Sequence, residues 1–213
     1  MLKNNNFSLF FLISLFSIII VLITNNYLKT TELFYNSYIE NFSSQQVKEI
    51  IRVKEKWFWT GYIIIPLSIL IRTHLVSFCL SIGLFFFEEK RSIKFRKILK
   101  ITLFGEIVFA LSGCLKFVYF YFFKIDFTIN DLENFQPLSY INFLDISKIE
   151  PCLLYPLQTI NLFEIAYFLL LVFGLHKLLK NNYWKSFEIV AVSYGTGLII
   201  WIGLLMFFTL NIS

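Results

Sequence analysis

Residues 7–24 read FSLFFLISLFSIIIVLIT, a run without a charged side chain. About 20 consecutive apolar residues allow an α-helix to cross the hydrocarbon core of a membrane, which is roughly 30 Å thick. Residues 16–23 lack the alternation of apolar and polar side chains that a strand of a membrane barrel shows. Because backbone groups in lipid must bond to one another, the run is predicted to be a spanning helix. Thr24, Asn25 and Asn26 offer no small-residue cleavage site, so we expect this helix to be retained.

Four further apolar stretches have the length of a membrane span. They cover about residues 62–87, 98–122, 159–179 and 187–210. Of the 213 residues, 57% are hydrophobic and 15% are charged, whereas a soluble domain is about 45–50% apolar and about 25% charged. This composition excludes a disordered chain and a soluble globular one. The sequence predicts an all-α fold, a polytopic membrane bundle of five transmembrane helices that forms a single membrane domain over residues 1–213.

The connecting segments predict an orientation, because loops rich in Lys and Arg stay in the cytoplasm. Loops 88–97 and 180–186 are basic, whereas loop 123–158 carries more acidic than basic side chains. Its acidic side chains are Asp126, Asp131, Glu133, Asp145 and Glu150. We therefore expect loops 88–97 and 180–186 inside, loops 25–56 and 123–158 outside, the N-terminus in the cytoplasm and the C-terminus outside.

The external loop 25–56 conflicts with this orientation because it is also basic. Its basic side chains are Lys29, Lys48, Arg52, Lys54 and Lys56. Ser43 and Gln46 have the spacing of a helix start, in which each side chain bonds the backbone of the other. We predict a short external interfacial helix at about 44–56, and a plain helical extension of the second span is the alternative.

The second apolar stretch, Trp57–Phe87, is longer than a span requires. Its length as a helix is about 46 Å, so it must tilt, kink near Pro66 or extend beyond the lipid. Trp57 and Trp59 are expected at the headgroups. A re-entrant hairpin would need a turn near residues 72–74, where the sequence has neither Gly nor Pro.

Five ionisable side chains within the predicted spans are Arg72, His74, Glu106, Lys116 and Glu164. Such groups near the middle of a membrane cost about 2.5–3.5 kcal/mol, so they usually face a partner or a water-filled cavity. From the helix rise, Arg72, Glu164 and Lys116 lie about 4, 6 and 9 Å outward of the centre, and Glu106 lies about 6 Å inward. We predict an ion pair between Arg72 and Glu164, with Lys116 nearby, because a guanidinium can bond a carboxylate twice.

These side chains have more than one interpretation. The Arg72–Glu164 pair can fix which helices pack together, or it can line the path of a solute or ion. Lys116 can instead extend outward to the membrane surface. Glu106 has no base at its own depth, so Glu106 and His74 are predicted as a polar or proton site. Glu106 is there either a neutral acid, a partner of His74 or a partner of Lys100.

Small residues four positions apart indicate where helices approach closely. Ser77 and Ser81 have this spacing in the second span, and Ser193 and Gly197 have it in the fifth. Gly105 is a further small residue in the third span. The pattern predicts helix contacts at these positions and carries no function by itself.

The sequence lacks the signatures of common catalytic chemistry. It has no glycine-rich phosphate loop, no HExxH and no cluster of His and carboxylates suited to a metal. Glu88 and Glu89, followed by Lys90 and Arg91, are similar to the paired glutamates of intramembrane CAAX-type proteases. The later Arg and His residues that those enzymes need are not in the required positions. We expect no enzymatic activity, no cofactor and no metal site.

The basic loop before the third span is predicted to contact anionic lipid headgroups. Its basic side chains are Lys90, Arg91, Lys94, Arg96 and Lys97. They alternate with apolar side chains and adjoin a membrane span, which favours lipid over nucleic acid as the partner.

Within the fourth span, Asn161-Leu162-Phe163-Glu164-Ile165 is followed by an apolar run that ends at Gly174-Leu175, and then come a short basic loop and a closing helix. This layout, over about residues 57–210, resembles the Yip1-type five-span membrane proteins. The sequence departs from the eukaryotic members, which carry a long cytoplasmic N-terminal tail. The resemblance implies membrane organisation and partner binding without catalysis.

The sequence thus supports three functions of different classes. The first is a non-enzymatic organiser or accessory subunit in a bacterial cytoplasmic (inner) membrane, which binds a protein partner or a second copy of itself. The second is a small transporter whose path is lined by Arg72, Glu106, Lys116 and Glu164, and the third is an intramembrane enzyme. A polar cavity open to one side of the membrane would favour transport, and a dry, satisfied charge pair would favour the organiser.

Overall fold

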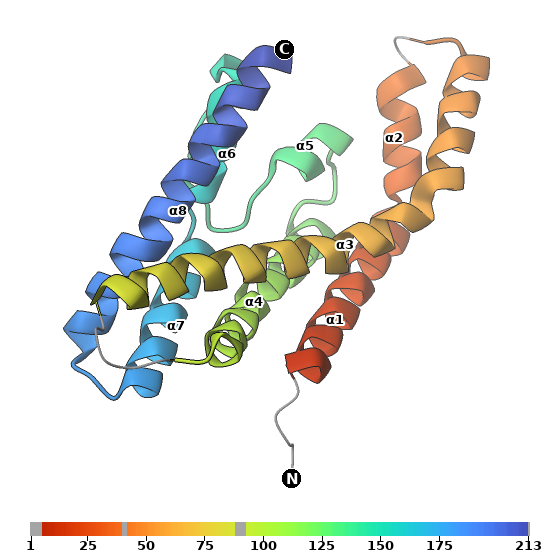
Figure 1. Ribbon diagram of the computed structural model, residues 1–213. Helices are drawn as coiled ribbons and strands as arrows, with labels where there is room; N and C mark the ends of the chain where they lie inside the picture. The colour runs from red at the N-terminus through yellow and green to blue at the C-terminus, as the bar shows by residue number, and fades with distance from the viewer. Residues whose placement is uncertain (1–5, 40–41, 88–92, 213) are drawn as a thin grey trace.

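The computed structural model describes residues 6–39, 42–87 and 93–212, and there the chain folds into helices and connecting turns (Figure 1). The helices are α1 (Asn6–Tyr27), α2 (Thr30–Ile39), α3 (Ser44–Phe87), α4 (Phe95–Val118), α5 (Ile129–Asn134), α6 (Pro151–Thr159), α7 (Leu162–Leu179) and α8 (Tyr183–Ile212). A π-helical turn, Tyr119–Phe123, continues α4. Five helices, namely α1, α3, α4, α7 and α8, are long and apolar enough to cross a membrane. The predicted all-α bundle with five membrane helices is confirmed.

Four of the membrane helices form a row, and the fifth lies across it. Along the row, α1 contacts α4, α4 contacts α7, and α7 contacts α8. Helix α3 crosses this row at a steep angle and contacts α1, α4 and α8 (Figure 1). The described chain begins and ends at opposite ends of the bundle in this view.

Helix α3 is a single helix of 44 residues, which corresponds to about 66 Å, twice the thickness of the hydrocarbon core. Residues 44–56 are helical as predicted, and they form the extension of the second span that the sequence left as the alternative. The predicted start is confirmed, because Ser43 N donates to Gln46 Oε1 at 3.1 Å and Gln46 N donates to Ser43 Oγ at 3.4 Å. The first turns of α3 bend away from the part of the helix that crosses the bundle (Figure 1).

Helix α2 packs against the first turns of α3 and forms a helical hairpin with them. Val47 is completely buried in this hairpin, and Lys54 Nζ lies 3.7 Å from the centre of the Phe34 ring. Helix α2 lies in a segment that the sequence predicted to be loop, whereas the helix at residues 44–56 was predicted. We call residues 30–39 together with residues 44–56 the hairpin; it projects at the same end of the molecule as the C-terminus (Figure 1).

The main core lies where α3, α4, α7 and α8 meet. It contains Leu80 of α3, Ile98 of α4, Tyr167 and Leu171 of α7, and Ile189 of α8, all at most 1% exposed. The faces turned away from this core carry large exposed apolar side chains, which suits helices surrounded by lipid. Packing inside the bundle therefore places α7 next to both α4 and α8.

Part of the predicted outer loop is ordered by a short capped helix, α5. Thr128 N donates to Asp131 Oδ2 at 2.9 Å, and Asp131 N donates to Thr128 Oγ1 at 3.1 Å. Lys124 Nζ lies 2.9 Å from Asp131 Oδ1. The backbone N–H of Thr128 first, and then the Lys124 ammonium, lower the pKa of Asp131 below its ordinary value.

Replacing Asp131 by alanine is expected to loosen α5 at neutral pH and to have little effect in strong acid. Because the pKa of Asp131 is lower in the folded than in the unfolded protein, where it is about 3.9, the carboxylate stabilises the fold at a pH above this value. This contribution is lost as the pH falls through the pKa of the folded state. The cap is worth about 1 kcal/mol, and the exposed ion pair adds less. Hydrogen exchange of the α5 amides measures the difference, with the exposed Asp126→Ala as control. An equal effect at both pH values would contradict this account.

Candidate functional site

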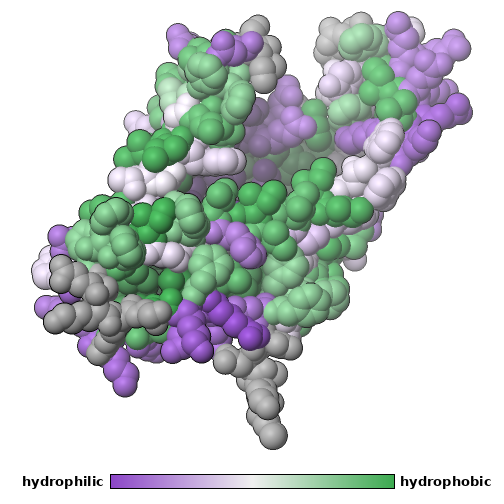
Figure 2. Space-filling model, in the orientation of Figure 1, coloured by the Kyte–Doolittle hydropathy of each residue, from purple (hydrophilic) through white to green (hydrophobic). Residues whose placement is uncertain are grey.

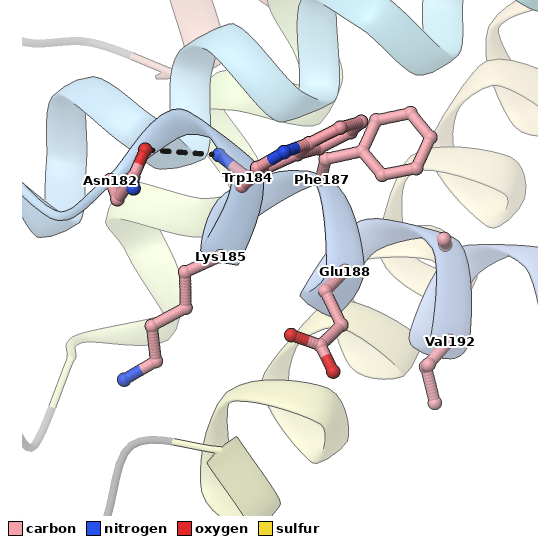
Figure 3. Close-up of a pocket in the computed structure, with 7 residues that line it drawn as sticks. Asn182, Trp184, Lys185, Phe187, Glu188 and Val192 are labelled. Atoms are coloured by element: carbon pink, nitrogen blue, oxygen red, sulfur yellow. Dashed lines mark hydrogen bonds between the residues drawn. The ribbon is translucent and has the colours of Figure 1, made fainter.

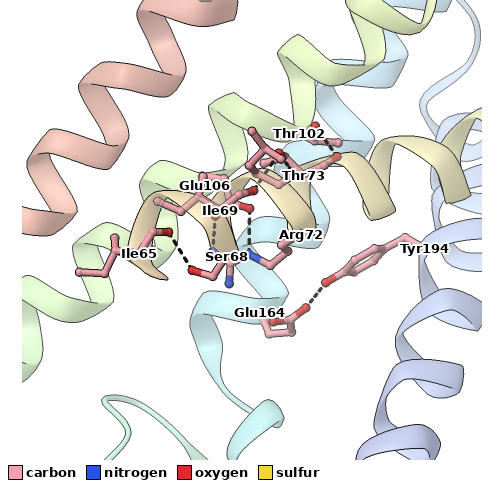
Figure 4. Close-up of polar contacts among 10 residues, drawn as sticks. Ile65, Ser68, Ile69, Arg72, Thr73, Thr102, Glu106, Glu164 and Tyr194 are labelled. Atoms are coloured by element: carbon pink, nitrogen blue, oxygen red, sulfur yellow. Dashed lines mark hydrogen bonds and ion pairs between the residues drawn. The ribbon is translucent and has the colours of Figure 1, made fainter. Parts of the chain in front are cut away.

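Two charged side chains from crossing helices form an ion pair inside the bundle. Arg72 of α3 donates from Nε to Glu106 Oε1 of α4 at 2.9 Å, and its Nη2 donates to Glu106 Oε2 (Figure 4). The Glu106 side chain is 1% exposed and that of Arg72 is 43% exposed. The guanidinium carbon of Arg72 also lies 4.1 Å from the centre of the Phe109 ring, a cation–π contact. The buried carboxylate thus receives both of its bonds from one arginine.

A second polar pair joins α7 to α8. The hydroxyl of Tyr194 on α8 donates to Glu164 Oε1 in the first turn of α7 (Figure 4). Asn161 begins α7 as its N-cap, and Asn161 Oδ1 accepts from Glu164 N at 2.8 Å. The asparagine side chain satisfies a backbone donor that a helix start leaves free, and it holds Glu164 at a fixed place facing α8.

Tyr167 lies between the two pairs. Its ring centre is 4.9 Å from that of Phe109 and 5.6 Å from that of Tyr194. Tyr167 is completely buried, and its hydroxyl has no hydrogen-bond partner among the described residues. Arg72, Glu106 and Glu164 all lie near enough to Tyr167 to influence its hydroxyl group electrostatically. We call Arg72, Glu106, Glu164, Tyr167 and Tyr194 the polar cluster.

The predicted ion pair between Arg72 and Glu164 is wrong, because Arg72 bonds Glu106 instead. Glu164 is close enough to interact with Arg72 electrostatically, but its hydrogen bond comes from Tyr194. The prediction matched residues by depth, which assumes that all helices run along the membrane normal. Since α3 lies across the row, distance along this helix does not measure depth. Glu106 therefore has a base after all, and that base is Arg72.

Lys116 and His74 lie apart from the polar cluster. The charged group that interacts with Lys116 is Glu133, in α5. The exposed side chain of His74 has Nδ1 2.8 Å from the Leu70 carbonyl oxygen, and its ring lies 6.2 Å from that of Phe95. Lys116 is therefore not a neighbour of the Arg72 pair, and the partner of Glu106 is not His74.

Close helix contacts hold the cluster in place. A Cβ atom on Gly105 would lie 2.6 Å from the Tyr167 ring, and a Cβ atom on Gly197 would lie 2.8 Å from Cys79 Sγ. Between α3 and α4, Ser77 Oγ lies 2.8 Å from Thr102 Oγ1, a hydrogen bond in which either can donate. The predicted contacts at Ser77, Gly105 and Gly197 are confirmed.

Neither tyrosine of the cluster was predicted from the sequence. Tyr167 follows Glu164 by three residues, a spacing that places both side chains on one face of a helix. Tyr194 is an isolated phenol in the middle of an apolar span, where its hydroxyl needs a partner. These two signals were available in the sequence, but neither indicates which helix supplies the partner.

Three hollows on the described surface lie away from the polar cluster. One is at the start of α8, where Trp184 and Phe187 point one way and Lys185 and Glu188 the other (Figure 3). The other two are lined by residues of α2 and its surroundings, among them Glu32 and Asn36. Arg72, Glu106 and Glu164 line none of these three.

The basic residues predicted to contact lipid lie partly within the described chain. Lys94, Arg96 and Lys97 are exposed at the start of α4, and Asn6 Nδ2 donates to the Arg96 carbonyl oxygen at 2.9 Å. Figure 2 shows hydrophilic surface at the lower edge of the molecule, opposite the end at which the hairpin projects. Lys90 and Arg91 lie outside the described residues.

The fold and the polar cluster define a multi-pass α-helical membrane protein with charged and phenolic side chains inside its bundle. Comparison of the chain with protein-family models, curated proteins and solved structures gave no match. The resemblance to Yip1-type proteins therefore stays a prediction.

Proposed function

We propose that this protein is a non-enzymatic organiser or accessory subunit of a bacterial cytoplasmic membrane, and that it binds a membrane-protein partner through the hairpin. The observation that carries the proposal is the projection of the hairpin: α3 has 44 residues, more than the roughly 20 that a span needs, and its first turns bend away from the bundle together with α2 (Figure 1). Residues 44–56 form these first turns, and within them the side chain of Val47 is completely buried. A projecting helical hairpin offers a partner a rigid surface.

The surface of the hairpin suits a polar partner outside the lipid. Lys48, Glu49, Arg52, Glu55 and Lys56 are all exposed on the first turns of α3. They mix both charges, which gives specificity in association without a large apolar patch. We place the hairpin on the outer side of the membrane with the C-terminus, and we place the exposed Lys94, Arg96 and Lys97 against anionic headgroups on the cytoplasmic side.

The pairing of charges within the bundle supports an organising role over transport. Arg72 and Glu106 satisfy one another, and Glu164 bonds Tyr194, so both contacts tie neighbouring helices together. Lys116, which the transport hypothesis placed on the same path, interacts with Glu133 instead. A scaffold needs these contacts to be stable, whereas a transport path needs them to open.

Photo-crosslinking in native membranes tests the proposal. A photoreactive residue at Glu49 or Arg52 is expected to give a discrete adduct of defined mass, whereas the same residue at Ile199, which is 71% exposed on α8, is expected to label lipid. An adduct of twice the chain mass would identify a second copy as the partner. No adduct from the hairpin, together with solute flux in reconstituted vesicles that Glu106→Gln abolishes, would contradict the proposal and favour a transporter.

A further inference from the structure

The polar cluster has an unequal charge count. It holds one guanidinium, that of Arg72, and two carboxyl groups, those of Glu106 and Glu164. The groups that face Glu164 are Arg72 from α3, Glu106 from α4, Tyr167 from α7 and Tyr194 from α8. If both carboxyl groups were ionised, the cluster would carry one uncompensated negative charge inside the membrane, which is costly.

The hydrogen bonds indicate which carboxyl group lacks a cation. Both oxygens of Glu106 accept from Arg72, so Glu106 is the ionised partner of the pair. Among the described residues, the Glu164 carboxyl group accepts a hydrogen bond only from the neutral hydroxyl of Tyr194. Arg72 attracts a charge on Glu164 without bonding it, whereas the charge of Glu106 repels one. The start of α7 favours a negative charge at Glu164, but this is a weak effect beside an unpaired buried charge.

The buried hydroxyl of Tyr167 supplies an independent observation. Its oxygen is without a hydrogen-bond partner among the described residues, although the side chain is completely buried. Buried polar atoms are usually bonded, so such an atom needs an explanation. Tyr167 lies one turn after Glu164 on the same face of α7, and the two side chains form no hydrogen bond with one another in this structure.

We infer that the polar cluster is a binding site for one proton, which is carried by Glu164. The proton comes from water and binds Glu164 Oε2, while the Tyr194 hydroxyl continues to donate to Oε1. Rotation of the Glu164 or Tyr167 side chain then lets the protonated oxygen donate to the hydroxyl oxygen of Tyr167. The cluster becomes neutral overall, with one ion pair and one carboxylic acid, and each of its polar groups has a partner.

The position of the site determines the side from which the proton arrives. Glu164 lies in the first turn of α7 and is only partly buried, whereas Glu106 is 1% exposed. The proton therefore exchanges at the end of the bundle that carries the hairpin. Losing it would place two like charges between α4 and α7 and weaken the contact of these helices. This inference does not rest on the proposed function, and its failure would leave partner binding by the hairpin untouched.

Infrared spectroscopy of the full-length protein in lipid nanodiscs tests the inference. An ordinary glutamate, whose pKa is about 4.3, is ionised at about pH 7. We nevertheless expect a carboxylic-acid carbonyl band at this pH. The band should disappear in Glu164→Gln and persist in the control Glu188→Gln, a substitution of an exposed glutamate on α8. Tyr194→Phe should shift the band, because the carbonyl oxygen loses its hydrogen bond. No band in the natural sequence, or a band that persists in Glu164→Gln, would overturn the inference.

Stability of the two glutamine variants gives a second readout. A neutral Glu164 predicts that Glu164→Gln unfolds at nearly the same denaturant concentration as the natural protein. Glu106→Gln, the same substitution at the ionised partner, should unfold at a clearly lower concentration. Equal losses in both variants would show that Glu164 is ionised and would overturn the proton site even if the band could not be recorded.

Discussion

Glu106→Gln is expected to lower the free energy of unfolding by about 3 kcal/mol, the lower end of the cost of breaking a buried ion pair. Arg72 would keep its charge and lose the carboxylate that its Nε and Nη2 both contact. We expect the lower end because the Arg72 side chain is 43% exposed. Because glutamine is almost the same size as glutamate, the loss of stability comes from the missing charge and not from a cavity. Denaturant unfolding in detergent micelles, followed by circular dichroism, measures the change.

Exchanging the two charges distinguishes the contribution of the ion pair to stability from the contribution of each side chain alone. The double variant Arg72→Glu with Glu106→Arg should recover part of the stability that each single change loses, because opposite charges again face one another. Glu49→Gln, on the exposed surface of the hairpin, is the matched control and should change stability by less than about 0.5 kcal/mol. If the double variant lost the sum of the two single losses, the contact of Arg72 with Glu106 would not contribute to folding.

Gly105→Val is expected to destabilise the bundle by about 3 kcal/mol, a large value for overpacking. A Cβ atom at this position would lie 2.6 Å from Cε2 and 2.8 Å from Cδ2 of the Tyr167 ring. That ring cannot move aside easily, because Tyr167 is completely buried against Phe109 and Tyr194. Either α4 and α7 separate, or the tyrosine leaves the polar cluster. The same unfolding titration measures the loss.

Gly203→Val is the matched control for this prediction. Gly203 lies in α8, and a Cβ atom there would have no neighbour within 4 Å, so the change should have little effect. Combining Gly105→Val with Tyr167→Leu should recover part of the stability, because the smaller side chain leaves room for the valine. Equal behaviour of the two glycine variants would mean that α4 and α7 are not packed as closely as described.

Local sequence patterns were sufficient for the membrane helices and their starting points. The charge-free run at residues 7–24 needs only its length and composition to be a span, and α1 covers it. The Ser43 and Gln46 start of α3 was also visible, because capping depends on side chains only three residues apart. Helix α2 was missed because residues 30–39 have neither the apolar length of a span nor a strong cap, and packing against α3 stabilises them.

The polar cluster was predictable in part. The sequence identified Arg72, Glu106 and Glu164 as the costly side chains, and the structure brings these three together. It assigned the wrong carboxylate to Arg72 because the crossing of α3 over α4 depends on contacts between residues far apart in the chain. Lys116 was included by depth alone, although α5 supplies its charged neighbour.

The amino-acid sequence by itself determined that this chain is a bundle of five membrane helices, since hydrophobic length and internal backbone bonding act within each segment. It also determined which charged side chains lie within the predicted spans, among them Arg72, Glu106 and Glu164. Only the tertiary structure decided that Arg72 meets Glu106 and that Glu164 meets Tyr194. The physical reason is that partners across helices are selected by crossing angles and close packing, and these depend on the whole bundle at once.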